Sequence, residues 1–364
     1  YLILFFLILN GCSSNIYDRF EDTVLTDNTF IVNDTIVKRN PVKLLIDPPT
    51  PSNKFLGYPI GLYIYNLSSD NPDEKFDSWL NKKPKRYTRL SKILSDKQVK
   101  QLKKYNNSFN EFLKSLGQKP FKLSDTDVNN NISRLKQFYN NEGYFDSKVS
   151  VDTIIEGKKA NLQYRVETNT RYLIDSISLK FKSNDIDSLY KISKSASLIK
   201  KDEYFSINKL LLERDRLISL FKNNGIHDFQ QRSINFNVLI DSTGNKKKIP
   251  LVLTVNNKDK ENEYSVKSIN DIKIYVESLD ELSNISSYTD SLSYNGVKIY
   301  SKGNLNYSPR SLTEPIFFKK RQKFIENDKL LTSRYFSNLG AFKYPRIIVE
   351  EQRDSLNTSI YLLP

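Results

Sequence analysis

The sequence predicts an α+β protein built from three tandem βααββ domains, each a three-stranded mixed sheet with two helices on one face. Three observations predict this class: a helix ending that occurs three times, two alternating strands after each ending, and a further strand before each helix. A length of 364 residues suits two to four domains that each bury a core. Three domains therefore fit both the repeat and the length.

The chain opens with nine apolar residues, 1–9, followed closely by the only cysteine, Cys12. Nine residues are too few to cross a bilayer as a helix, which takes about 20, but they match the apolar part of a secretory signal. Residues 1–11 are therefore predicted to be a partial signal peptide, and the missing initiator methionine indicates a piece of a longer gene product. The alternative for Cys12 is a buried or incidental thiol.

The charge balance is strongly basic, with 56 lysines and arginines against 42 aspartates and glutamates, a formal net charge of +14. Such an excess is compatible with nucleic acid, an anionic membrane surface or acidic partners. The lysines are scattered among asparagines along nearly the whole chain and do not form one stripe with interleaved aromatics. No nucleic-acid partner is therefore predicted.

The repeated helix ending reads aromatic-x-Asn-x-Gly and occurs at residues 139–143, 221–225 and 336–340. The helices before the first two endings carry apolar residues at helical spacing. Gly143, Gly225 and Gly340 are predicted to stop the helices in a left-handed conformation, which glycine adopts without a Cβ clash.

Two runs of alternating apolar and polar residues follow each glycine, which is the pattern of a hairpin with one buried face. The first strands of the hairpins cover residues 148–155, 232–240 and 346–350, and the second strands cover 160–166, 251–255 and 358–362. Opening strands are predicted at 30–37, 172–177 and 264–269, the last two sharing the pattern Tyr-x-aliphatic-x-x-Ile. A shorter helix is expected around 186–199.

These elements predict the division of the chain. Residues 1–11 form the signal and 12–27 an N-terminal segment, and the three domains cover 28–170, 171–260 and 261–364. The first domain is expected to carry a long insertion. The third is expected to carry one around residues 278–306, where Ser, Asn and Tyr occur without a clear period.

The repeated unit resembles the POTRA domain of Omp85-type outer-membrane assembly proteins, the BamA/TamA-like family. The resemblance rests on the threefold order and on the helix endings Gly-Tyr-Phe at 143–145 and Gly-Ala-Phe at 340–342. The second ending departs from the pattern at 225–227, with Phe229 in the place of the aromatic residue. Residues 9–12 resemble the lipobox of bacterial lipoproteins, which implies a lipid on Cys12. Because it combines this lipobox with the long insertion of the first domain, the chain is similar to the TamA-like lipoproteins (TamL) of Bacteroidetes-type bacteria.

The resemblance implies a function in the assembly and insertion of outer-membrane β-barrel proteins. It places the chain at the outer membrane, lipid-anchored, with its domains in the periplasm and a β-barrel following residue 364. The implied partners are unfolded β-barrel proteins, the membrane reached through the lipid and the barrel, and a TamB-like inner-membrane protein. A stand-alone periplasmic or surface lipoprotein that acts as a scaffold or binding module is the alternative.

The family's sheet has its first hairpin strand at an edge, where a client strand can be added through backbone hydrogen bonds, a mode called β-augmentation. The resemblance therefore places client or partner binding on eight residues: Val149, Val151, Thr153, Ile234, Phe236, Val238, Ile347 and Val349. The alternative for the neighbouring Lys148, Arg232 and Arg346 is that their charges discourage uncontrolled edge pairing.

No enzymatic activity, cofactor or metal is predicted. The only histidine, His227, has no second histidine with which to share a metal and lies far in sequence from Cys12. No Gly-x-Ser-x-Gly elbow points to hydrolysis, and the lysine-rich turns at 157–159 and 244–246 lack the spacing of a phosphate loop. The acidic pair at 350–351 is expected to be solvated surface near a strand end.

Overall fold

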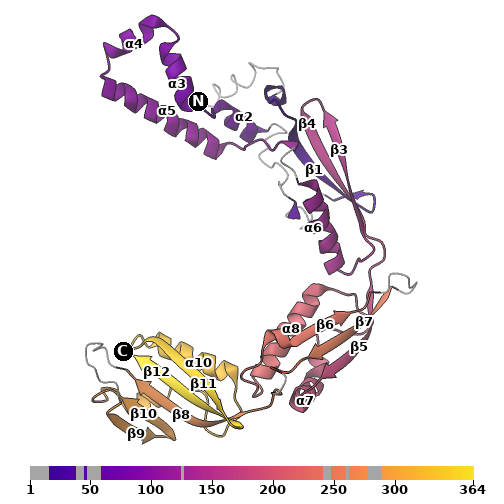
Figure 1. Ribbon diagram of the computed structural model, residues 1–364, viewed down its shortest axis with the longest axis vertical. Helices are drawn as coiled ribbons and strands as arrows, with labels where there is room; N and C mark the ends of the chain where they lie inside the picture. Colours follow the sequence, from indigo (N-terminus) through magenta and orange to yellow (C-terminus); the bar gives the residue numbers. More distant parts are fainter. Residues whose placement is uncertain are drawn as a thin grey trace. The chain divides into compact units, whose positions relative to one another are not determined.

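The computed structural model describes residues 16–37, 45–46, 59–123, 127–240, 247–259, 262–277 and 288–364. The chain divides into two compact units, Tyr1–Thr170 and Arg171–Pro364, whose elements are labelled in Figure 1. The predicted signal, Cys12 and the first part of the third domain's insertion, 278–287, lie outside the described residues. Within the described ranges, no helix combines the length and apolar character needed to span a bilayer.

The first unit holds a four-stranded sheet in the order β2-β1-β4-β3. Strand β1 (Val24–Val32) runs parallel to β4 (Lys159–Glu167), and β3 (Lys148–Glu156) is antiparallel to β4. The short β2 (Thr35–Ile36) pairs with β1. Helix α6 (Val128–Asn141) buries Leu135 in a core with Leu25, Phe30, Leu162 and Tyr164.

The second unit begins with a three-stranded sheet in the order β5-β7-β6. Strand β5 (Leu173–Phe181) is parallel to β7 (Lys248–Val255), and β6 (Ile234–Val238) is antiparallel to β7. Helices α7 (Asn184–Ser193) and α8 (Ile207–Lys222) supply four residues to the core of this sheet: Ile186, Tyr190, Leu217 and Phe221. Short 3₁₀ segments η4 (Lys194–Ala196) and η5 (Gln231–Ser233) complete this part.

The same unit continues with a five-stranded sheet in the order β11-β12-β8-β10-β9. Strand β8 (Ser268–Val276) lies between β12 (Ser355–Leu363) and β10 (Val297–Ser301), parallel to both. The antiparallel outer strands are β11 (Lys343–Gln352) and β9 (Asp290–Tyr294). Helices α9 (Pro309–Thr313) and α10 (Glu326–Asn338) bury Leu312 and Phe336 in the core.

All three sheets share one topology, so the predicted α+β class with mixed sheets is confirmed. The opening strand is parallel to the last strand, and the first hairpin strand is antiparallel to the last strand on its other side. Each opening strand also carries one extra residue opposite its partner, and these three bulge residues are Thr26, Asp175 and Asn270. The bulge recurs at the same point of each sheet, two residues after the point where the opening strand bridges to the segment before the main helix, at Lys122, Tyr204 and Lys323.

The repeated helix ending has the expected conformation in each case. Gly143, Gly225 and Gly340 have φ angles of +87°, +101° and +65°. The aromatic residue four positions earlier is buried in each case: Tyr139, Phe221 and Phe336. Phe229 packs on Phe221 with ring centroids 4.8 Å apart, as Phe342 packs on Phe336 at 6.0 Å, so Phe229 does take the aromatic place.

The predicted three-stranded sheets are correct only for the middle sheet. The first sheet gains β2, and the third gains the β9–β10 hairpin within the predicted insertion, where the mostly exposed β9 shows no alternation. The helix expected at 186–199 ends at Ser193. Strand β1 begins at Val24, before the predicted domain start at residue 28, because Val24 and Leu25 are buried.

The opening strand predicted at 264–269 is also displaced. Strand β8 starts at Ser268. When β8 and β5 are aligned by their bulge residues, Ile269 corresponds to Ile174. The sequence pattern matched Ile174 with a residue three positions earlier than Ile269. Tyr264 lies outside the strand because its ring packs on Phe229 in the core of the middle sheet, 4.8 Å between centroids.

Within the described residues, the insertion of the first unit contains four helices: α2 (Ile60–Leu67), α3 (Pro72–Asn81), α4 (Pro84–Ser91) and α5 (Asp96–Leu116). A capping box of Ser95 and Gln98 begins α5. Lys103 of α5 holds α3 through ion pairs with Asp73 (3.3 Å) and Asp77 (2.8 Å). Helix α2 is joined to the sheet because Leu62 is buried with Ile16, Tyr17 and Val24.

Candidate functional site: three open sheet edges

Each sheet places its first hairpin strand, β3, β6 or β11, at an outer position. No further strand pairs with these three in the part of the chain that the structure describes. The eight residues predicted for client binding lie on these strands, three on β3, three on β6 and two on β11. The three edges belong to different sheets, so the predicted residues form three separate candidate sites.

The direction of the backbone groups in the first sheet follows from two hydrogen bonds. The Val24 N–H donates to the Lys158 carbonyl and the Asn33 N–H to that of Val166. Because backbone groups alternate sides along a strand, even-numbered residues of β4 face β1 and odd-numbered ones face β3. The odd residues oppose Ser150, Asp152 and Ile154. The remaining β3 residues, Val149, Val151 and Thr153, therefore direct their N–H and C=O groups to the open edge.

The same reasoning applies to the other two edges. In the middle sheet, the Leu173 N–H donates to the Lys247 carbonyl and the Asn256 N–H to that of Ser233, so odd residues of β7 face β5. Their register partners on β6 are Ile234, Phe236 and Val238, whose backbone groups thus point outward, but the Ile234 N–H already donates to the Gln231 carbonyl. In the third sheet the Glu277 N–H donates to the Leu362 carbonyl, so even-numbered residues of β12 face β8. Ile347 and Val349 of β11 oppose even-numbered residues of β12 and therefore direct their backbone groups to the open edge.

The edges differ in what surrounds the outward groups. Strand β3 is exposed over its C-terminal half, including Ile154 and Ile155. Strand β6 has only five residues but is followed by the exposed Leu239 and Ile240. Strand β11 carries an irregularity between Lys343 and Arg346 around Pro345, which lacks an N–H to offer. A long extended partner therefore fits β3 best.

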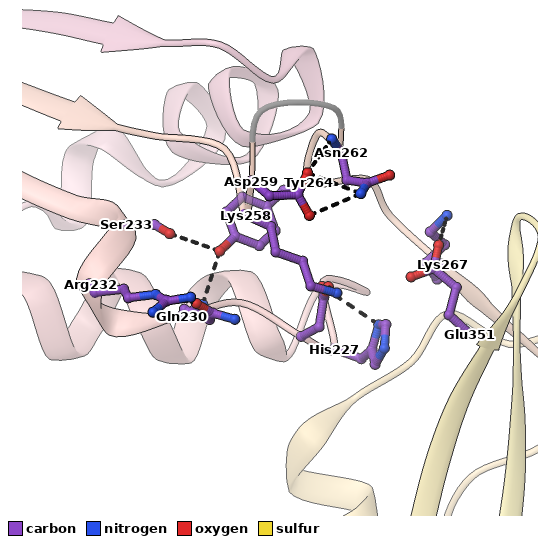
Figure 2. A network of polar contacts seen from close by, with 11 residues as sticks. His227, Gln230, Arg232, Ser233, Lys258, Asp259, Asn262, Tyr264, Lys267 and Glu351 are labelled. Atoms are coloured by element: carbon purple, nitrogen blue, oxygen red, sulfur yellow. Dashed lines mark hydrogen bonds and ion pairs between the residues drawn. The ribbon is translucent and has the colours of Figure 1, made fainter.

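The β11 edge ends at a polar junction with the middle sheet, drawn in Figure 2. Lys267, in the segment before β8, pairs with Glu351 of β11 at 2.7 Å and with Asp354 at 3.6 Å. Nearby, the buried Tyr264 hydroxyl lies 2.8 Å from the Ser233 hydroxyl and accepts a bond from the Gln230 N–H at 3.3 Å. These contacts join the two sheets of the second unit. The sequence gives no signal for them, because the residues belong to separate segments.

His227 lies at the same junction and, with Asp228 and Glu351, forms a group whose ligand atoms lie within 4.8 Å of one another. Both carboxylates are already paired with ammonium groups, Asp228 with Lys258 and Glu351 with Lys267, each at 2.7 Å. Figure 2 shows His227 with Lys258 on one side and the Lys267–Glu351 pair on the other. The two lysines therefore already balance the negative charge of the carboxylates, which a metal cation would otherwise do. The group is better described as an ion-pair network.

The junction predicts a pH dependence of stability. Burial lowers the pKa of His227 from its usual 6.5, although Asp228 and Glu351 oppose the shift. The unfolded chain therefore binds more protons below pH 6.5, and stability is expected to fall as the pH decreases from 6.5 until the folded-state pKa is passed. Calorimetric melting of the second unit in the full chain should show this loss, and His227→Gln should remove it. Equal slopes in both proteins would contradict the assignment.

Fold and site together define a repeat of α+β modules, each with its first hairpin strand at one edge of its sheet. No family model matches the sequence, and no curated protein matches it. Among solved structures, the chain is similar to POTRA domains 3–5 of BamA from Haemophilus influenzae, with 12% identity, a TM-score of 0.31, and coverage of 68% of this chain and 83% of that one.

Two further solved structures give similar values. The N-terminal domain of Omp85 from the cyanobacterium Thermosynechococcus elongatus has 7% identity, a TM-score of 0.24, and coverage of 68% of this chain and 86% of that one. BamA from Haemophilus ducreyi lacking POTRA domains 1–3 has 9% identity and a TM-score of 0.34, and the match covers 53% of this chain and 29% of that one.

Proposed function

We propose that the chain is a lipid-anchored POTRA module of an Omp85-type outer-membrane assembly machine. In this proposal it lies in the periplasm, tethered through Cys12, and receives unfolded β-barrel proteins or a TamB-like partner on its sheet edges. The observation that carries the proposal is a threefold one: in every sheet the same strand lies at the edge and turns the backbone of the predicted binding residues outward. Backbone groups are common to all sequences, so one edge suits many clients.

Proline substitutions test this proposal because proline lacks the N–H that a client strand would use. At Val151, Val238 and Ile347 that N–H points away from the sheet, so Val151→Pro, Val238→Pro and Ile347→Pro keep the bonds to the neighbouring strand. We expect the triple variant to bind a urea-unfolded β-barrel protein about tenfold or more weakly, since each lost backbone bond contributes about 1 kcal/mol.

The matched control replaces the same three residues by threonine, which keeps every N–H and favours strands. Its affinity should stay within about twofold of the parent, because β-augmentation depends on the backbone. Binding would be followed by fluorescence anisotropy of the labelled client, with circular dichroism to verify folding. Equal affinity of the proline and threonine variants would show that clients do not use these edges.

A further inference from the structure

Helix α5 exposes an apolar stripe that the edge-strand function does not use. The α5 stripe consists of residues spaced three and four apart, Leu102, Tyr105, Phe109, Phe112 and Leu116, which are between 42% and 70% exposed. The helix is held from another side, where Val99 and Asn110 are buried and Lys103 pairs with α3. The spacing places the stripe along one line of the helix surface.

Positive charge is concentrated in the segment that contains α5. Residues 72–116 contain twelve lysines and arginines against five aspartates and glutamates, which is half of the net charge of the chain in an eighth of its length. Lys97, Lys100 and Lys104 are exposed and follow helical spacing along α5, beside the stripe. An amphipathic helix with aromatic and leucine residues on one face and lysines on the polar face is suited to an anionic membrane surface.

The short chain between Cys12 and Ile16 limits the distance between the proposed lipid and the helices of the insertion. Ile16 is four residues after Cys12 and is buried against Leu62 of α2, so extended chain allows at most about 14 Å between the lipid-bearing residue and this contact. At the end of α5, Gly117 approaches the Tyr65 backbone of α2 so closely that a Cβ would lie 2.5 Å from the Tyr65 nitrogen. Helix α2 therefore connects the lipid attachment point to α5.

We propose that α5 docks on an anionic bilayer surface, with the α5 stripe among the lipid headgroups and the lysines against their phosphates. The part of this argument that uses Cys12 rests on the proposed function, whereas the stripe and its charge do not. A second copy of the chain is a poorer occupant, because pairing of two stripes would bring the same lysines together. An acidic helix of another protein is the remaining alternative, and a chain that neither binds the vesicles nor dimerises would favour it over the bilayer.

The test uses the chain from residue 12 onward with Cys12→Ser, which contains every described residue but can carry no lipid at that position. Its sedimentation with vesicles of phosphatidylethanolamine and phosphatidylglycerol is compared with that on phosphatidylcholine vesicles. We expect binding to the anionic vesicles that weakens with salt. Phe109→Gln with Phe112→Gln should weaken it on the order of tenfold or more, because partition scales with the apolar area inserted.

The matched control is Ile192→Gln with Leu212→Gln, which removes two exposed apolar side chains from α7 and α8 and should leave binding unchanged. Replacing Lys97, Lys100 and Lys104 by glutamine should abolish the preference for anionic vesicles. Absence of vesicle binding, or equal binding of the Phe109/Phe112 variant and its control, would overturn the proposal. If the chain does not bind vesicles but forms a dimer that Phe109→Gln with Phe112→Gln disrupts, the stripe binds a second copy of the chain instead.

Failure of this inference is distinguishable from failure of the proposed anchor. Acylation of Cys12 is measured separately, by labelling cells that express the lipobox-containing chain with a radioactive fatty acid and comparing Cys12→Ser. A chain without the label would remove the lipid from the proposed function but would leave the vesicle result, which is obtained without any lipid on the protein, as it stands.

Discussion

Glu213→Ala is expected to lower the free energy of unfolding of the second unit by about 3–5 kcal/mol. The Glu213 side chain on α8 is fully buried, and its carboxylate accepts hydrogen bonds from Arg216 at 2.8 and 2.7 Å, the Ser197 hydroxyl at 3.0 Å and the Leu198 N–H at 2.9 Å. The hydrogen bond from Arg216 also raises the pKa of that guanidinium. Removing the carboxylate leaves the largely buried Arg216 guanidinium and the Leu198 N–H without this acceptor, while the Ser197 hydroxyl keeps the Ile199 carbonyl.

Glu203→Ala is the matched control, because it removes a glutamate that also pairs with a residue of α8 but near the surface. Glu203 bonds Lys209 at 2.7 Å with both side chains partly exposed, so its loss should cost about 0–1 kcal/mol. Hydrogen exchange of the α8 amides in the full chain would measure both effects in place. A loss at Glu213 as small as that at Glu203 would contradict the description of a buried, fully bonded carboxylate.

Gly225→Ala is expected to destabilise the second unit by about 2–4 kcal/mol. The φ of +101° at Gly225 lies outside the region that alanine tolerates. An added Cβ would also lie 2.7 Å from Cγ1 of Val266 and 2.9 Å from Cγ of Lys323. The backbone has little freedom to move away, because the Gly225 carbonyl accepts a bond from the Lys267 N–H at 2.9 Å.

Gly340→Ala provides the comparison, because this glycine ends the equivalent helix of the third sheet. Its φ of +65° is the left-handed region, and no atom lies within 4 Å of an added Cβ. The substitution should therefore cost only the conformational term, about 1–2 kcal/mol. Thermal melting of the two variants in parallel separates the effects. Equal losses would mean that the contact between Gly225 and the segment before β8 does not limit the backbone.

The repeat could be predicted because it depends on local rules. Alternation marks the buried face of each central strand, for example Leu162 and Tyr164 in β4, and the glycine endings follow from backbone sterics. The β9–β10 hairpin and the four helices of the insertion could not be predicted in the same way. Strand β9 is nearly all exposed, and α3 to α5 are polar and held partly by ion pairs such as Lys103 with Asp77.

The candidate site could be predicted only in part. Alternation groups residues such as Ile347 and Val349 on one face, and the same period of two gives them one common backbone direction. Which direction that is depends on the hydrogen bonds of the neighbouring strand, which the sequence does not reveal. The misplaced opening strand at 264–269 has a similar cause: Tyr264 matches Tyr172 in pattern, but its contacts with Phe229 and Ser233 hold it against the core of the middle sheet.

The central claim is that client strands pair with the outward backbone of β3, β6 and β11. Residue-resolved hydrogen exchange of the chain, with and without a urea-unfolded outer-membrane β-barrel protein, tests it most directly. The account predicts that at least one edge gains protection at its outward amides, those of Val151, Phe236 or Ile347. Amides that already bond the adjacent strand, such as those of Ser150 and Asn235, should change little. A client that binds while all outward amides of the three edges exchange as before would contradict the account.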